Sequence, residues 1–360
     1  ADGADLITAS KGTDNVRLGE NAGDSIASGG DENVVIGKDA GTAITTGDRN
    51  TVIGHQAGDA VTTGGRNTLM GYKSGSALVD PDRNVAFGYG SLESDTKGTK
   101  STAIGYSALN TQNQTSSTDT HNTAVGYTAG ESITTGTSNT LIGSRNGDAL
   151  TTGVSNVAVG DEALGSETTA NRSVAVGVGA LLNQNVGSGS NAYNTAIGHA
   201  AGNQITSGIQ NTLVGSLAGD ALQACSDNVA VGYSALTTNV GGQNNVAVGP
   251  YSLQNYNNSS GNDYNTAVGS NAGRDTTTGL ANTYVGGHAG LYTSTNNYTT
   301  FIGRSAGFGT SGSALTGNFN TAVGYEAGYK LITSARTNTF LGAYAGYFNG
   351  STSTANGITT

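Results

Sequence analysis

The sequence has few charged residues, few aromatic residues and almost none of the residues that cross-link or kink a chain. Only 11% of its 360 residues are charged, Trp is absent, and there are two Pro and one Cys. A typical soluble domain carries about 25% charged residues, so this composition does not fit a conventional globule. The single cysteine, Cys225, excludes an intrachain disulfide and a thiolate metal cluster.

Positive charge and long apolar runs are also scarce. The formal net charge is -10, so we expect no basic stripe and no nucleic-acid partner. An anionic surface is repelled by acidic membranes, and no apolar run reaches the roughly 18 residues of a membrane span. We therefore expect no membrane insertion. No signal peptide is visible at Ala1, as in a processed mature form.

Glycine is abundant, with 58 copies, and it marks a repeat. The core of the repeat reads Asn-Thr-Ala-Val-Gly, as in residues 122–126, and its glycine is called position 0 below. Twelve of the eighteen intervals between these glycines are 17 residues, and the others are 18, 20 or 21. The nineteen repeat glycines are Gly19, Gly37, Gly54, Gly71, Gly88, Gly105, Gly126, Gly143, Gly160, Gly177, Gly198, Gly215, Gly232, Gly249, Gly269, Gly286, Gly303, Gly324 and Gly342.

The period and composition predict an all-β fold, a parallel β-solenoid (β-roll) of about nineteen short coils. Seventeen residues cannot hold two packed helices, and each glycine would cost about 1 kcal/mol inside a helix. We expect two short strands per coil, with coils stacked about 4.8 Å apart into a rod on the order of 90 Å long. The chain is interpreted as one repeat array, 1–360, with a partial coil 1–14, coils over 15–346 and a partial coil 347–360. Cys225, which replaces a common turn glycine, is interpreted as a small turn residue.

Each position of the repeat predicts a structural role. Position −1, such as Val125, is apolar in every copy and is interpreted as the coil interior. Position −2, such as Ala124, should face the other side, where other chains would cover it. Asn122 and Asn194, at position −4, are expected in turns as left-handed residues whose amides form ladders. The repeat glycines Gly126 and Gly198 are expected to be structural as well.

Positions +4 and +7 vary together. Where +4 is Gly, as at Gly130, position +7 is usually aliphatic, as at Ile133; where +4 is Leu, as at Leu109, position +7 is polar. One core slot is thus expected to be filled from either position, although the coils of Gly269, Gly286, Gly303 and Gly342 depart from the rule. Two coils of each kind form a four-coil unit, which ends in an enlarged loop. The loops are expected to project near 110–121, 182–193, 254–264 and 308–319.

The core motif resembles the repeats of phage tail fibres and the Asn-Ser-Val-Ala-Ile-Gly repeats in the heads of YadA-type trimeric adhesins. The resemblance runs from Asn15 to about Gly346, but the repeat of those adhesins is shorter than 17 residues. It implies a left-handed, homotrimeric β-roll. The same resemblance implies a surface fibre, and neither a chaperone domain nor a stalk is present in the sequence.

No constellation of catalytic or metal-binding residues is evident. The four His fall on unrelated coils, and the tandem calcium-solenoid motif is missing. The adjacent acids Asp31-Glu32 and Asp161-Glu162 could serve as glycosidase carboxylates only in a cleft completed by another chain. We therefore expect no enzyme activity, no metal and no cofactor.

A column of tyrosines is the strongest candidate binding surface. Tyr72, Tyr89, Tyr106 and Tyr127 occupy position +1 in four consecutive coils and should stack on one outer corner. The stack could stabilise the ladder, or it could bind sugar rings together with neighbouring polar loop residues. Those loop residues are Asn110, Gln112, Asn113 and Gln114.

Together these features predict an extracellular structural fibre or adhesin shaft, on a virion or a cell surface. We expect a homotrimer that attaches to a host glycan or protein receptor. The alternatives are a self-assembling extracellular filament, in which copies polymerise end to end, and a tailspike polysaccharide hydrolase. An ice-binding solenoid is a further alternative, although the Thr-Thr pairs recur in too few consecutive coils for a long flat array.

Overall fold

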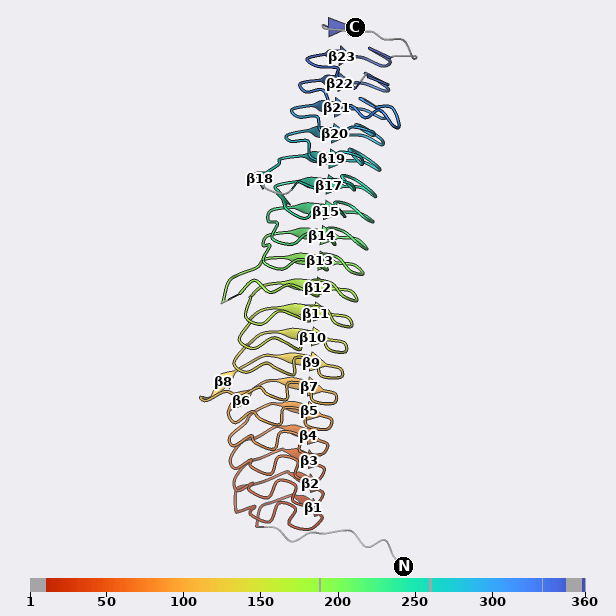
Figure 1. Cartoon of the computed structure of the whole chain (residues 1–360). Coiled ribbons are helices and arrows are strands. Elements are labelled where there is room, and N and C mark those ends of the chain that lie inside the picture. Colours follow the sequence, from red (N-terminus) through yellow and green to blue (C-terminus); the bar gives the residue numbers. More distant parts are fainter. Residues whose placement is uncertain (1–10, 188, 259–260, 332, 348–357, 360) are drawn as a thin grey trace, which may run out of the picture. The chain divides into compact units, whose positions relative to one another are not determined.

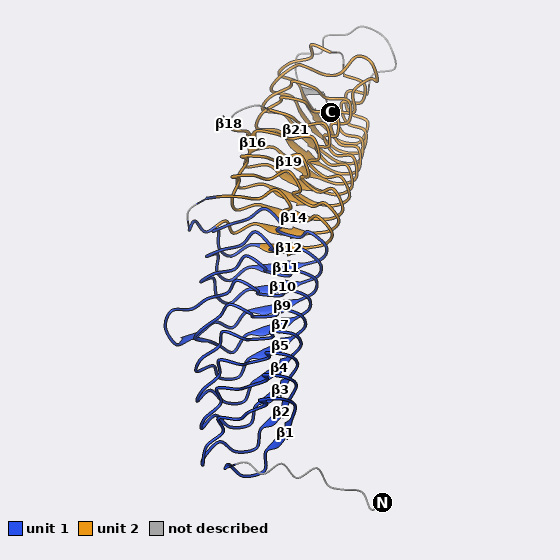
Figure 2. Ribbon diagram, turned by 60° about the horizontal axis from the view of Figure 1, so that its bottom comes forward, with its two compact units in different colours: residues 1–173, 187–191 blue, residues 174–186, 192–360 orange. Residues whose placement is uncertain are grey.

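The computed structural model describes residues 11–187, 189–258, 261–331, 333–347 and 358–359. It confirms an all-β chain, a parallel β-solenoid of about nineteen coils, and the described residues contain no helix. Accordingly, no helix in the described part is long and apolar enough to cross a membrane. The chain divides into two compact units, residues 1–173 with 187–191 (unit 1) and residues 174–186 with 192–360 (unit 2; Figure 2). The partial coils predicted for 1–14 and 347–360 lie largely outside the described residues.

Unit 1 is built on nine three-residue strands that pair in parallel, each with the next along the chain (Figure 1). They are β1 (Val16–Leu18), β2 (Val34–Ile36), β3 (Thr51–Ile53), β4 (Thr68–Met70), β5 (Val85–Phe87), β7 (Thr102–Ile104), β9 (Thr123–Val125), β10 (Thr140–Ile142) and β11 (Val157–Val159). The enlarged loop after residue 110 carries β8 (Thr118–Asp119), which pairs with β6 (Gly98–Thr99) beside the main stack (Figure 1).

Unit 2 repeats this arrangement with eleven strands. They are β12 (Val174–Val176), β13 (Thr195–Ile197), β14 (Thr212–Val214), β15 (Val229–Val231), β17 (Val246–Val248), β19 (Thr266–Val268), β20 (Thr283–Val285), β21 (Thr300–Ile302), β22 (Thr321–Val323), β23 (Thr339–Leu341) and β24 (Ile358–Thr359). A small side ladder pairs β16 (Gly242–Gln243) with β18 (Gly261–Asn262).

Most coils carry one three-residue strand, and only the coils with β6, β8, β16 or β18 hold a second, two-residue strand, so the prediction of two strands in every coil is wrong. The second segment still bonds from coil to coil, since the Thr134 amide donates to the Thr151 carbonyl at 2.9 Å. It is nevertheless not a regular strand. Thr128 and Gly130 before it and Ser138 after it have positive φ of 49°, 59° and 60°, so the chain turns at both ends of the segment.

The strand faces are the reverse of those predicted. Position −2, exemplified by Ala124, is fully buried inside the coil, whereas Val125 at position −1 is only partly covered and points outward. Position −1 is predicted to be interior because it is apolar in every copy, but it lies on the outer face, and the thin interior holds mainly alanine at position −2. Both faces are apolar as expected, but the aliphatic face and not the alanine face is the outer one.

The asparagine column decides which face points inward. The Asn139 amide Nδ2 donates to the Gly153 carbonyl at 2.9 Å, and its Oδ1 accepts the Asn156 backbone amide at 3.0 Å. Asn122 and Asn194 make the same bonds, to the Gly136 and Gly208 carbonyls at 2.8 Å. The predicted amide ladder is therefore confirmed, but the left-handed residue is the one before each Asn, such as Ser138, and not the Asn itself. The Asn side chain at position −4 faces inward. Because side chains alternate along a strand, the side chain at −2 then faces inward and those at −3 and −1 face outward.

A single large side chain explains the four-coil period. Leu141 fills the interior from position −2, and it lies between Gly130 in the preceding coil and Gly147 in its own. A Cβ atom at either glycine would lie 2.6 and 2.8 Å from the Leu141 methyl groups, closer than any real contact. Each large −2 residue thus requires glycine at +4 in two successive coils. Leu69 and Leu213 have the same glycine neighbours.

Three of the four coils that depart from the +4/+7 rule carry an aromatic residue at position −2, and the fourth, the coil of Gly269, directly precedes the coil of Tyr284. Tyr284 is fully buried between Gly273 and Gly290, and its ring occupies the slot that an aliphatic +7 residue fills elsewhere. Thr276 and Thr293 stand at +7 instead and direct their hydroxyls to the Tyr284 Oη at 3.4 and 3.3 Å. Burial raises the pKa of Tyr284. Phe301 and Phe340 occupy position −2 in two further coils.

The repeat glycines permit the close stacking of coils. Gly126 and Gly198 have φ of 142° and 138°, a region that side chains rarely adopt. A Cβ atom at Gly126 would collide with the backbone of Gly143 in the next coil, and one at Gly198 with that of Gly215. The structural role predicted for these glycines is thus explained by conformation and contact.

We predict that Leu141→Ala lowers the free energy of unfolding by about 2–5 kcal/mol, because it removes a fully buried side chain that neighbouring glycines cannot replace. The matched change at half-buried Leu182 should cost clearly less, on the order of 1 kcal/mol. Urea unfolding followed by circular dichroism measures both. Equal effects would contradict the placement of position −2 in the core.

We predict that Asn139→Ala is destabilising out of proportion to its size. It leaves the Gly153 carbonyl and the Asn156 amide without their buried partner, at about 1–3 kcal/mol for each group. Thr135→Ala, in an exposed turn of the same coil, serves as the control. A shift in urea midpoint no larger than that of the control would show that the amide ladder contributes little.

Candidate interaction surface

The outer face of the strands is an apolar surface along each unit. In unit 1 the outward positions −3 and −1 hold Val, Ile, Leu, Met, Phe and Thr. Phe87 is 51% exposed and Ile142 is 41% exposed. A monomeric soluble protein rarely leaves a contiguous apolar face of this kind open to water, so it indicates an interaction surface.

The predicted tyrosine stack is present on unit 1. Successive ring centroids from Tyr72 through Tyr89 and Tyr106 to Tyr127 lie 4.9, 5.2 and 5.4 Å apart, with interplanar angles of 10–19°. His55 extends the column by one coil, 5.5 Å from Tyr72. The column therefore runs along five consecutive coils at one edge of the outward face.

In this stack the faces of the tyrosine rings contact neighbouring rings, whereas the ring edges stay accessible to solvent. Each inner ring has a neighbour on both faces, and the four tyrosines are 38–55% exposed. None of the four hydroxyl groups has a hydrogen-bond partner within the described part of the chain. Sugar rings stack on aromatic faces, so this column is better suited to hydrogen bonding through its hydroxyl rim than to stacking.

Two of the four predicted loop residues are buried and not available to a ligand. Gln112 is fully buried, where its Nε2 donates to Asp95 at 2.6 Å and its Oε1 accepts from Asn122 at 2.8 Å. Gln114 is 6% exposed, whereas Asn113 is exposed and Asn110 is half-buried. Gln112 stands at +7 after a leucine, so it fills the polar slot of its coil and continues the amide ladder past Ser101.

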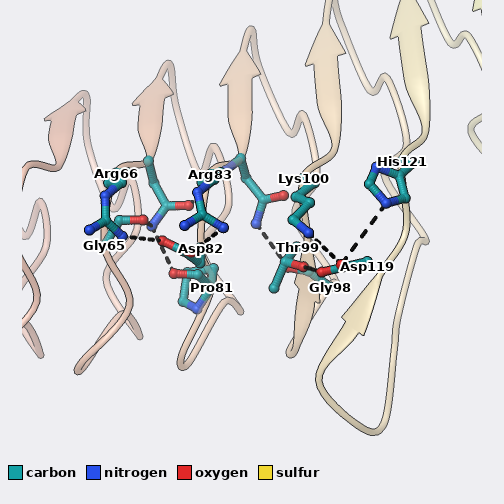
Figure 3. Close-up of polar contacts among 12 residues, drawn as sticks. Gly65, Arg66, Pro81, Asp82, Arg83, Gly98, Thr99, Lys100, Asp119 and His121 are labelled. Atoms are coloured by element: carbon teal, nitrogen blue, oxygen red, sulfur yellow. Dashed lines mark hydrogen bonds and ion pairs between the residues drawn. The ribbon is translucent and has the colours of Figure 1, made fainter.

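A column of basic residues lies at the opposite edge of the outward face, contrary to the expectation of no basic stripe. It occupies position −5, where Arg66, Arg83, Lys100 and His121 lie beside the start of successive strands (Figure 3), and Arg49 precedes them. The signal in the sequence was three intervals of 17 residues between basic side chains. The negative net charge gave no sign of this column, because acidic residues flank the basic ones.

Most of these basic residues pair with a carboxylate one coil away, and Arg83 pairs with the adjacent Asp82. Asp82 accepts from Arg66 at 3.3 Å and from Arg83 at 3.0 Å, and Arg49 bonds Glu32 at 2.8 Å. Lys100 contacts Asp119 and holds the pKa of that carboxyl below its usual range. These pairs are exposed and hence individually weak, so they leave the cations available for further contacts.

Acidic residues line one pocket of unit 1 and make ion pairs elsewhere on that unit. A pocket in unit 1 is lined by Asp48, Asp80 and Asp82, but hydrogen bonds from the Thr62 and Thr63 hydroxyls lower the pKa of Asp80. A glycosidase acid needs a raised pKa. Of the adjacent acids, Glu32 bonds Arg49, and Asp161 and Glu162 both lie within ion-pair distance of Arg145.

No group of three or more His, Cys, Asp or Glu side chains among the described residues is arranged to hold a metal ion. No protein-family model matches the chain, and no curated protein matches it in sequence.

Cys225 is buried in a turn, as its small-residue interpretation predicted. Its Sγ lies 2.8 Å from the Val240 carbonyl, and burial raises the pKa of the thiol to about 11. We therefore predict that iodoacetamide does not modify Cys225 at pH 8 in the native protein, because the reactive thiolate is scarce and enclosed. Mass spectrometry should show one adduct only after unfolding in urea. Rapid labelling of the native protein would show that this turn opens.

Proposed function

We propose that this protein is the shaft of an extracellular structural fibre or adhesin, in which three parallel copies pack their outward sheet faces together. The fibre would stand on a virion or a cell surface and carry the contact with a host glycan or protein receptor. The proposal is supported above all by the apolar outer face, whose aliphatic side chains recur in every coil.

The size of this face suits association of identical chains. The nine strands of unit 1, about 4.8 Å apart, and a face about 20 Å wide give on the order of 800 Å² per copy, the amount that each partner of a stable complex typically buries. A head-to-tail contact that closes on itself gives a ring such as a trimer. Aliphatic columns then meet aliphatic columns, which removes them from water.

The receptor contact would fall on parts of the surface that the sister chains leave free. The enlarged loop of residues 110–121 is the best candidate in unit 1, since it projects beside the main stack and exposes Asn113 (Figure 1). The filament and hydrolase alternatives stay open at this point. Polymers of undefined length would favour the filament, and release of reducing sugar from a host polysaccharide would favour the hydrolase.

We predict that native mass spectrometry detects a single species of three times 35.7 kDa. The double variant Ile142→Lys and Val159→Lys should be monomeric with an unchanged circular dichroism spectrum, because two lysines on the outer face cannot be desolvated at the interface. Thr135→Lys, in an exposed turn, should remain trimeric. A monomeric wild-type protein, or a double variant that is still trimeric, would contradict the proposal.

A further inference from the structure

The two edges of the outward face carry different chemistry at the same coils of unit 1. Position −5 is basic at Arg66, Arg83 and Lys100, and position +1 of the same three coils is Tyr72, Tyr89 and Tyr106. The next coil continues the pattern with His121 and Tyr127. Other coils do not combine a basic residue at −5 with a tyrosine at +1. In the coil of Gly37 these positions hold Glu32 and Lys38, and in the coil of Gly19 they hold the like-charged Asp14 and Glu20.

The two columns cannot meet within one chain. Five residues lie between Arg83 and Tyr89, and three of these form the extended strand β5, so the columns lie on the order of 15–20 Å apart. The basic column therefore has no access to the tyrosine hydroxyls of its own molecule. A second copy of the chain presents both a tyrosine edge and a basic edge, so it can supply partners for both columns at once.

Donors and acceptors on the two edges are complementary. The tyrosine column presents hydroxyl oxygens without partners among the described residues. The basic column presents donors on side chains that are 52% exposed at Arg66, 54% at Arg83 and 32% at Lys100, in surface ion pairs. A guanidinium keeps free N–H groups while it bonds one carboxylate, because it has five donors.

Unit 2 contains an example of the pairing within one chain. The Arg304 Nη1 donates to the Tyr325 hydroxyl at 3.2 Å, and the guanidinium lies 5.7 Å from the ring centroid. In the coil of Arg304 the edges are exchanged, since Tyr298 stands at −5 and Arg304 at +1. An arginine and an aromatic residue thus again occupy opposite edges of one coil.

We propose that the basic edge of one copy seats on the tyrosine edge of the next copy, coil against the same coil, in a parallel and closed homotrimer. This inference rests on the proposed function, since it assigns the contacts that set the register of the three chains. Arg66, Arg83 and Lys100 donate to Tyr72, Tyr89 and Tyr106 of the adjacent copy. An antiparallel arrangement or a shift by several coils would bring these cations opposite unmatched residues.

Cross-linking tests the register directly. The variant Arg83→Cys with Tyr89→Cys, treated with a short bis-maleimide, should give a covalent trimer on a denaturing gel. The reagent is too short to join the two cysteines within one chain, and Cys225 is enclosed in its turn. The matched control Arg83→Cys with Tyr127→Cys, displaced by two coils or about 10 Å, should cross-link poorly.

A second variant tests the bonds without introducing thiols. Tyr72→Phe, Tyr89→Phe and Tyr106→Phe together keep the ring stack and remove the acceptors, and each charged hydrogen bond is worth roughly a tenfold change in affinity. The concentration at which the trimer dissociates should rise at least tenfold, whereas Tyr329→Phe, at position +5 of its coil and so on neither edge, should leave it unchanged.

The outcomes separate this inference from the proposed function. A wild-type trimer that fails to cross-link between 83 and 89, or that the three phenylalanines leave unchanged, overturns the register and leaves the shaft intact. A wild-type monomer overturns both. Cross-linking of Tyr89→Cys alone would show two identical edges in contact and overturns the closed head-to-tail arrangement. A glycan bound by the native trimer and lost in the phenylalanine variant would make a sugar the occupant of the column.

Discussion

The buried asparagine ladder is the interaction on which the rest of this structure depends. Each amide bonds a turn carbonyl fourteen residues ahead and receives the backbone amide of the next asparagine, so it fixes both the closure of its own coil and the register of the next. A buried amide cannot turn outward without leaving these groups unpaired. The alternation of the strand then follows, with position −2 in the core and positions −3 and −1 on the surface.

Because the interior of each coil is narrow, a change of residue at one inward position is accompanied by a change at another. A leucine or an aromatic residue at position −2 needs two glycines, a leucine at +4 needs a polar residue at +7, and that polar residue can itself join the ladder, as Gln112 does. Because each substitution is compensated within one or two coils, the edges of the outer face are free to diverge. The basic and tyrosine columns are a consequence of that freedom.

The sequence was sufficient to predict the all-β class, the number of coils, the amide ladder and the tyrosine stack, because each depends on a residue type that recurs at a fixed spacing. It was misleading about the strand faces, since the apolar residue present in every copy at position −1 suggested that Val125 was inside and Ala124 outside, whereas the inward amide at −4 determines the alternation. The burial of Gln112 and Gln114 was missed because an enlarged loop was equated with exposure. Handedness and the number of chains stay predictions, because a single chain's repeat spacing contains neither.

The direction of the hydrogen bonds has a mechanical consequence for each unit. Parallel ladders place the inter-strand bonds along the stacking direction, so a pull in that direction strains them one layer after another instead of sharing the force among many at once. A lone solenoid under tension would therefore peel open from an end at low force. Side-by-side contact with sister chains would convert part of that load into shear across a broad hydrophobic seam, which resists far better because many contacts must slip together.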